Sequence, residues 1–161
     1  MMTCSRVVSV LLLLSAINLA LMIPGGLVET RDFPNYSVAV LAAFNVFLTG
    51  LGLGSLILAF RVFQTRQVGP LMPLAGLAYT AVYLLDLVHI FPVSSTPMPG
   101  PLMTLEVVGT ALGLALIDAG LRCKANGSAA DRSVVGLPRW ALVILPVLAG
   151  TIIIFATISA Q

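Results

Sequence analysis

Five apolar segments, separated by short polar stretches, dominate the pattern of hydrophobic and polar positions along the chain. They cover approximately residues 7–23, 37–60, 71–91, 102–121 and 140–158. Each segment is close to the roughly 20 residues that a helix needs to cross about 30 Å of hydrocarbon. Barrel strands are shorter and alternate in polarity, and only helices satisfy the backbone of such runs inside lipid. The pattern therefore predicts five transmembrane helices.

Composition supports a membrane protein. Of the 161 residues, 59% are hydrophobic and 9% are charged, and the mean hydropathy is +1.09. A soluble domain carries about 25% charged residues. So few charges cannot cover a globular surface in water, and the lipid bilayer is the expected partner. The net charge of +2, without a basic run or a phosphate-binding glycine motif, argues against nucleic acid as a partner.

The last apolar segment differs from the other four. It contains no charge and is apolar on all sides, which is typical of a helix that faces lipid. Pro146 should bend it or break one of its hydrogen bonds. We therefore predict an all-α integral membrane protein with a four-helix transmembrane bundle and a peripheral fifth transmembrane helix. Residues 1–161 form one polytopic membrane domain, with an inner linker at 122–139.

Glycines at helical spacing predict close packing in two of these helices. Gly50 and Gly54 lie four residues apart in the second segment, and Gly109 and Gly113 have the same spacing in the fourth. Small residues let helix backbones approach each other where lipid provides no hydrophobic drive for association. We expect these faces to pack within the bundle, or against a partner helix or a second copy in a homo-oligomer.

Basic residues between the segments predict the orientation. Seven of the eight fall on one side: Arg6, Arg61, Arg66, Arg122, Lys124, Arg132 and Arg139. Only Arg31 falls on the other. The positive-inside rule then places the N-terminus in the cytoplasm and the C-terminus outside the plasma membrane. The first segment could be a signal peptide, but no small-residue cleavage site follows it, so we expect an uncleaved helix.

Both cysteines, Cys4 and Cys123, fall on the predicted cytoplasmic side. Cytosolic thiols are kept reduced, so we expect no disulfide between them. Neither cysteine has a histidine nearby that would complete a zinc site. The sequence therefore predicts two free thiols.

The two predicted outer loops differ in character. The second contains four prolines and no charge: Pro92, Pro97, Pro99 and Pro101. Proline at this density stiffens a loop, so we expect a rigid cap over the ends of the third and fourth segments. The first outer loop is the only charged one, with Glu29, Arg31 and Asp32.

Polar residues of the apolar segments gather at one depth, in the outer half of the predicted bundle. The candidate cluster consists of Asp86, His89, Glu106, Tyr83, Asn18, Asn45 and Arg31. Asp86 and Glu106 lie roughly 7 to 9 Å from the outer ends of their segments, at a rise of about 1.5 Å per residue. Tyr83 shares a helix face with Asp86. Arg31 could fold back towards them from the first outer loop.

This cluster has three interpretations, because acidic groups within lipid need protons, water or a cation. The cation could be protonated His89, Arg31 or a metal. In the first interpretation, hydrogen bonds merely fix helix register, and the protein is a subunit or scaffold. In the second, the cluster binds or transports a proton, a cation or a small solute, as intramembrane ionisable groups often do. In the third, Asp86, His89 and Glu106 hold a catalytic divalent metal.

The enzyme interpretation has the weakest signal in the sequence. A single histidine without an HExxH-type motif does not specify a metal centre, so we predict none. His89 could be a single axial ligand of a haem or pigment, whereas a bis-histidine haem is excluded; no cofactor is assigned. We expect a non-enzymatic membrane subunit, scaffold or binding protein. Asp118 and Arg122, four residues apart near the inner side, are expected to form an ion pair.

Overall fold

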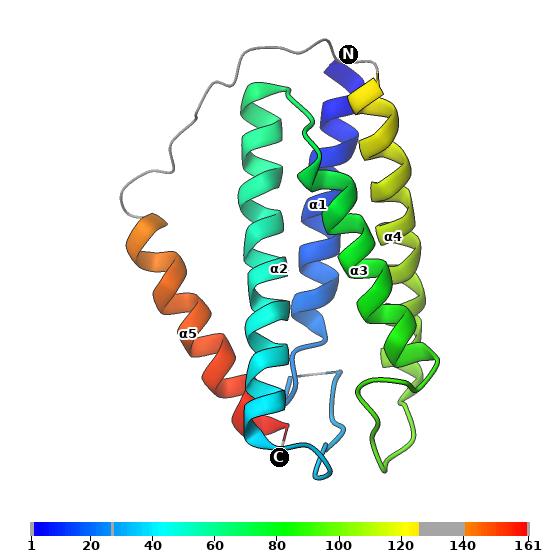
Figure 1. The fold of residues 1–161 in the computed structure, drawn as a ribbon, viewed down its shortest axis with the longest axis vertical. Coiled ribbons are helices and arrows are strands. Elements are labelled where there is room, and N and C mark those ends of the chain that lie inside the picture. The colour runs from blue at the N-terminus through cyan, green and yellow to red at the C-terminus, as the bar shows by residue number, and fades with distance from the viewer. Residues whose placement is uncertain (1, 27, 126–140, 161) are drawn as a thin grey trace.

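The computed structural model describes residues 2–26, 28–125 and 141–160, and all regular secondary structure in these ranges is helical. The helices are α1 (Met2–Leu21), α2 (Val38–Thr65), α3 (Leu71–Leu87), α4 (Gly100–Ala125) and α5 (Ala141–Ser159). Figure 1 shows α1 to α4 running side by side as a helical bundle, with α5 inclined against α2. Among the described helices, α5 contacts only α2.

Three of these helices are long and apolar enough to cross a membrane, judged by length and composition. They are α1, α2 and α4, whose most apolar stretches have hydropathies between 1.7 and 2.0. Helix α3 and the apolar part of α5 are shorter. The predicted inner linker at 122–139 starts inside α4, and most of it lies outside the described residues.

Helix α3 ends four residues before the apolar pattern predicts. The last helical residue is Leu87, and the chain then turns through His89, whose φ is +54°. Pro92 has no N–H to continue the hydrogen-bond ladder and restricts the residue before it to extended geometry. The apolar run to residue 91 therefore contains a helix end that hydrophobicity alone does not mark.

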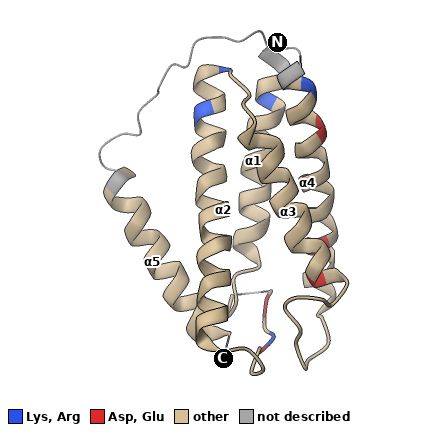
Figure 2. Ribbon diagram, in the orientation of Figure 1, with Lys and Arg blue, Asp and Glu red and all other residues tan. Residues whose placement is uncertain are grey.

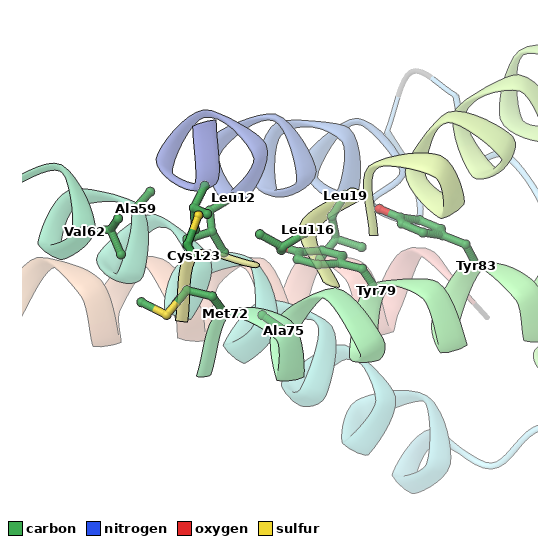
Figure 3. Close-up of a cluster of buried hydrophobic side chains, with 11 residues drawn as sticks. Leu12, Leu19, Ala59, Val62, Met72, Ala75, Tyr79, Tyr83, Leu116 and Cys123 are labelled. Carbon is green, nitrogen blue, oxygen red and sulfur yellow. The ribbon is translucent and has the colours of Figure 1, made fainter. Parts of the chain in front are cut away.

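Buried apolar side chains from α1 to α4 form the core. Figure 3 shows Leu116 beside the aromatic ring of Tyr79, and Leu12 beside Cys123, within this one cluster. The rings of Tyr79 and Tyr83 stack with their centroids 6.2 Å apart. The Tyr79 hydroxyl donates a hydrogen bond to the Ser55 Oγ at 3.0 Å, so this buried polar atom is satisfied.

Helices α3 and α4 are in close contact where Gly76 meets Gly113. A Cβ at Gly113 would lie 2.5 Å from the Thr80 Oγ1 and 3.0 Å from the Gly76 carbonyl oxygen, and Gly109 lies against the Tyr83 ring. The predicted packing role of the α4 glycines is thus confirmed. Gly50 and Gly54 of α2 do not pack within the described bundle, because no atom lies within 4 Å of a Cβ built at either, and their packing against a partner stays a prediction.

This contact gives a first prediction, for Gly113→Ala. The added methyl group would overpack the interface between α3 and α4, and we expect a loss of about 1–3 kcal/mol of stability. Thermal unfolding of the protein in lipid nanodiscs should show a lower Tm. The matched control is Gly54→Ala, which faces open space and should leave the Tm unchanged or slightly higher, because alanine favours the helix. Equal Tm values for the two variants would contradict a close contact at Gly113.

The two cysteines are bonded, so the prediction of free thiols is wrong for this structure. Cys4 near the start of α1 and Cys123 near the end of α4 form a disulfide, with their Cα atoms 6.0 Å apart. They meet because α1 and α4 are neighbours in the bundle. The sequence argument used only the expected compartment and contained no information on this proximity. We call this end of the bundle the disulfide end, and the opposite end, where α4 begins, the cluster end.

Charges are divided between the two ends. Figure 2 shows that the described Lys and Arg residues gather mainly at the disulfide end, whereas most acidic residues lie at the cluster end. The exception among the described acids is Asp118, whose Oδ1 accepts a hydrogen bond from the Arg122 Nε at 2.8 Å. This confirms the predicted ion pair. Both side chains are exposed, at 75% for Arg122 and 60% for Asp118, so the pair contributes little to stability.

Candidate functional site

The loop between α1 and α2 is folded against the cluster end. Gly25 has a φ of +76°, and its N–H donates to the Glu29 carbonyl oxygen at 3.2 Å. A Cβ at Gly25 would collide with Ser159, so glycine is what allows the loop to pass the end of α5. Further along, the Phe33 N–H donates to the Ala160 carbonyl oxygen at 3.0 Å. These contacts fix the loop between α5 and the rest of the bundle.

The loop between α3 and α4 closes over the same end. The Tyr36 hydroxyl accepts a hydrogen bond from the Val93 N–H at 3.0 Å, and the Ser94 hydroxyl donates to the Asp32 carbonyl oxygen at 3.0 Å. The Tyr36 ring also meets the Phe91 ring edge to face, with centroids 5.3 Å apart. The two loops therefore hold each other in place at the cluster end.

Arg31 is the centre of a buried ionic cluster. Its Nη1 and Nη2 donate to the two carboxylate oxygens of Asp86 at 3.0 and 2.7 Å. Its Nε and Nη2 donate to the Glu29 carboxylate at 3.0 and 2.6 Å. Burial acts to lower the pKa of the Arg31 guanidinium, but these hydrogen bonds and the two negative charges raise the pKa above its usual value. Arg31 is therefore a permanent cation in the cluster.

Glu106 is the third acid of the cluster and is not paired in this way. Its side chain is fully buried, and neither carboxyl oxygen has a hydrogen-bond partner among the described residues. The nearest cationic atom is the Arg31 Nη2, 3.8 Å from the Glu106 Oε1. One cation thus stands among three acids. An uncompensated buried charge costs several kcal/mol, so this site favours a proton, an added cation or a hydrogen-bond donor beside Glu106.

The ionic cluster lines a cavity of about 50 Å³, which has room for a few water molecules at about 10–15 Å³ each. Its polar wall comprises Glu29, Arg31, Asp86, Glu106, Tyr83 and Asn45. Most of the remaining wall is apolar and comes from α1, α2 and the two loops. We call this space the polar cavity. Glu106 is one of the lining residues, and both of its buried carboxyl oxygens lack a hydrogen-bond donor among the described residues.

Three further predicted residues are buried near the cluster and link helices. The Asn18 Nδ2 donates to the Tyr83 hydroxyl and to the Leu105 carbonyl oxygen, both at 3.1 Å, and so joins α1 to α3 and α4. The Asn45 Nδ2 donates to the Thr157 Oγ1 at 3.2 Å and joins α2 to α5. Tyr83 and Asn45 line the polar cavity, whereas Asn18 supports it from behind Tyr83.

The structure does not bring His89 into the cluster. Its side chain is exposed, and its Nδ1 lies 3.1 Å from the Leu87 carbonyl oxygen. The turn at the end of α3 separates the imidazole from Asp86, because the helix that was expected to carry both ends at Leu87. Within the described ranges, no group of three or more His, Cys, Asp or Glu residues is arranged to hold a metal ion. The arrangement gives a catalytic metal centre no support.

Glu29 is the cluster member that sequence reasoning missed. It is 5% exposed although it lies in a loop that was expected to face water. Its proximity to Arg31 in the sequence could have indicated that it belongs to the cluster. A segment that buries Arg31 also carries the acid two residues before it, and here the Arg31 N–H donates to the Glu29 Oε1 at 3.0 Å.

Comparison with known proteins places the chain in a family whose function is unknown. A family model described as a domain of unknown function (DUF8051) matches residues 4–134 of this chain. The matched range contains the ionic cluster and lacks α5. No curated protein and no solved structure matches the chain.

Proposed function

Since the chain belongs to the DUF8051 family of unknown function, we propose from its sequence and geometry that it is a non-enzymatic membrane protein that binds a small cation at the ionic cluster. In this proposal, α1 to α4 form a four-helix transmembrane bundle and α5 is a peripheral fifth span. Support comes from five apolar segments, three of which form helices of spanning length. The bilayer is then the main partner of the exposed apolar faces.

The proposed orientation has the N-terminus in the cytoplasm and the C-terminus outside the plasma membrane. The seven-to-one bias of basic residues supports it. The Cys4–Cys123 disulfide points the other way, because disulfides persist mainly in oxidising compartments. We follow the charge bias, since the neighbouring ends of α1 and α4 would hold the two thiols close together on either side. The polar cavity then lies near the outer surface.

The observation that carries the proposal is the Glu106 carboxyl, which is fully buried beside a cavity and accepts no hydrogen bond. A cluster that only fixed helix register would satisfy its buried polar atoms, as Asn18 and Tyr83 do. An added cation would satisfy Glu106 and offset the excess of acids over Arg31. The same excess disfavours an anion at this position.

The test is binding of ethylammonium to the protein in phosphatidylcholine nanodiscs at constant ionic strength. We expect ethylammonium to raise the Tm of the wild type, and acetate to have no such effect. Glu106→Gln should weaken binding about thirtyfold or more, since losing one charge of a buried pair costs about 2–5 kcal/mol. Without ligand, this variant should be as stable as the wild type or more so, because the neutral amide removes an uncompensated charge.

Asp118→Asn is the matched control, because it removes an exposed acid from the same helix and should leave ethylammonium binding unchanged. Two results would contradict the proposal. One is a wild type that binds no cation. The other is a Glu106→Gln variant that binds normally but unfolds at a lower temperature, which would make the cluster purely structural.

A further inference from the structure

A second, mainly apolar cavity adjoins the polar cavity. It has a volume of about 100 Å³ and is lined by α1, α2 and α5. Five residues line both cavities: Leu19, Met22, Pro24, Asn45 and Leu48. We call the second space the apolar groove. The shared walls place one end of the groove directly beside the polar cavity and its ionic cluster.

The apolar groove follows α2 away from the cluster end. Its lining on this helix lies between Asn45 and Leu56, which are separated by about 16 Å at a rise of about 1.5 Å per residue. On the other side it is lined by Ile152 and Ala156 of α5. Helices α1 and α5 both contact α2 but not each other, which leaves this groove between them. The inclination of α5 is visible in Figure 1.

We propose that the two cavities form one site for a single-chain cationic amphiphile, with its ammonium group at Glu106 and its hydrocarbon chain in the apolar groove. This inference rests on the proposed function and adds the class of ligand. A bare cation would fill only the polar cavity and leave the groove unoccupied. A neutral hydrocarbon would fill only the groove and leave Glu106 without a partner.

Charge also selects against an anionic or phosphate-bearing head group. Arg31 is the one cation that the described residues place in the cluster, and four of its five N–H groups already donate to Glu29 or Asp86. A phosphate would therefore meet three acids and a committed guanidinium. An alkylammonium has the required charge and hydrogen-bond donors, and no anionic group that the acids would repel.

The test uses dodecylamine with a photoreactive diazirine at the chain end, applied to the full chain in phosphatidylcholine nanodiscs. We expect cross-links on groove residues such as Leu53, Leu56 and Ile152, mapped by mass spectrometry and competed by unlabelled dodecylammonium. Gly52→Leu should reduce them about tenfold or more, because its side chain occupies the groove. The matched control is Gly54→Leu, because residue 54 does not line the groove. This variant should retain the cross-links.

The outcomes separate this inference from the proposed function. Ethylammonium binding that depends on Glu106, with cross-links spread evenly over outward residues such as Leu77 and Leu114, would overturn the amphiphile and leave cation binding standing. Labelling of the groove that persists in Glu106→Gln would overturn the amphiphile site, because the ammonium group would not be at the cluster, and a wild type that also binds no ethylammonium would be needed to overturn the proposed function. Competition by phosphatidylethanolamine as strong as by dodecylammonium would overturn the assignment to a single-chain amine.

Discussion

Replacing Arg31 with leucine should destabilise the protein by about 3–5 kcal/mol, the largest effect that we predict for one substitution. The substitution removes the cation that pairs with Asp86 and Glu29 while all three acids stay at the cluster end. Arg31 is 4% exposed, so water cannot replace its hydrogen bonds without opening the loop. A typical domain is stable by about 5–15 kcal/mol, so much of the folding free energy would be lost.

The matched control for this prediction is Arg122→Leu. It also removes an arginine from an ion pair, but both partners of that pair are exposed, and such pairs contribute little. Unfolding in nanodiscs, followed by circular dichroism, should show a large fall in Tm for the first variant and almost none for the second. Adding Asp86→Leu and Glu29→Leu to Arg31→Leu should recover part of the loss. Similar effects of the two single substitutions would show that Arg31 is not a buried partner.

Opening the disulfide should have the second largest effect, a loss of about 2–4 kcal/mol. Cys4 and Cys123 are 119 residues apart, so their bond restricts the unfolded chain over most of its length. Cys4→Ser and reductant-treated wild type should therefore both unfold at lower temperature than the oxidised protein. Reductant should not change the Tm of Cys4→Ser, which serves as the control. An unchanged Tm of the wild type after reduction would contradict the prediction.

The state of the same thiols in cells also reports the orientation. The proposed cytoplasmic N-terminus implies that Cys4 and Cys123 are reduced in intact cells and form their bond after purification in air. A mass tag on free thiols, added at lysis without reductant, should then label both. A protein that is already fully oxidised at lysis would overturn the proposed orientation in favour of the reverse one.

The sequence predicts the helices well because one physical demand, the burial of apolar residues at helical length, dominates this chain. Where another constraint, such as a turn or a helix–helix contact, decides the local structure, the predicted helix end or contact differs from the observed one. The end of α3 is set by the turn at His89 and by Pro92, and the apolar pattern continues past both. Gly50 and Gly54 have the same spacing as the glycines of α4, yet only the fold decides which glycine pair meets a neighbouring helix.

The cluster is predictable in part for the same reason. Asp86 and Glu106 stand out because charges within apolar segments need a partner. Arg31 stands out because it is the only arginine in the first outer loop. Glu29 does not stand out, since an acid in a polar loop is ordinarily hydrated. The Cys4–Cys123 pair depends on which helices are neighbours, and no local pattern encodes that.

The position of Arg31 has a consequence for the order in which the protein assembles. During synthesis Arg31 emerges 55 residues before Asp86, and at that time its only partner in the cluster is Glu29. Burial of Arg31 without Asp86 would leave two of its N–H donors unsatisfied, so we expect the loop to stay in water while α3 and α4 are made. We therefore expect the cluster end to form late in folding, since the loop can be buried fully only after α3 supplies Asp86.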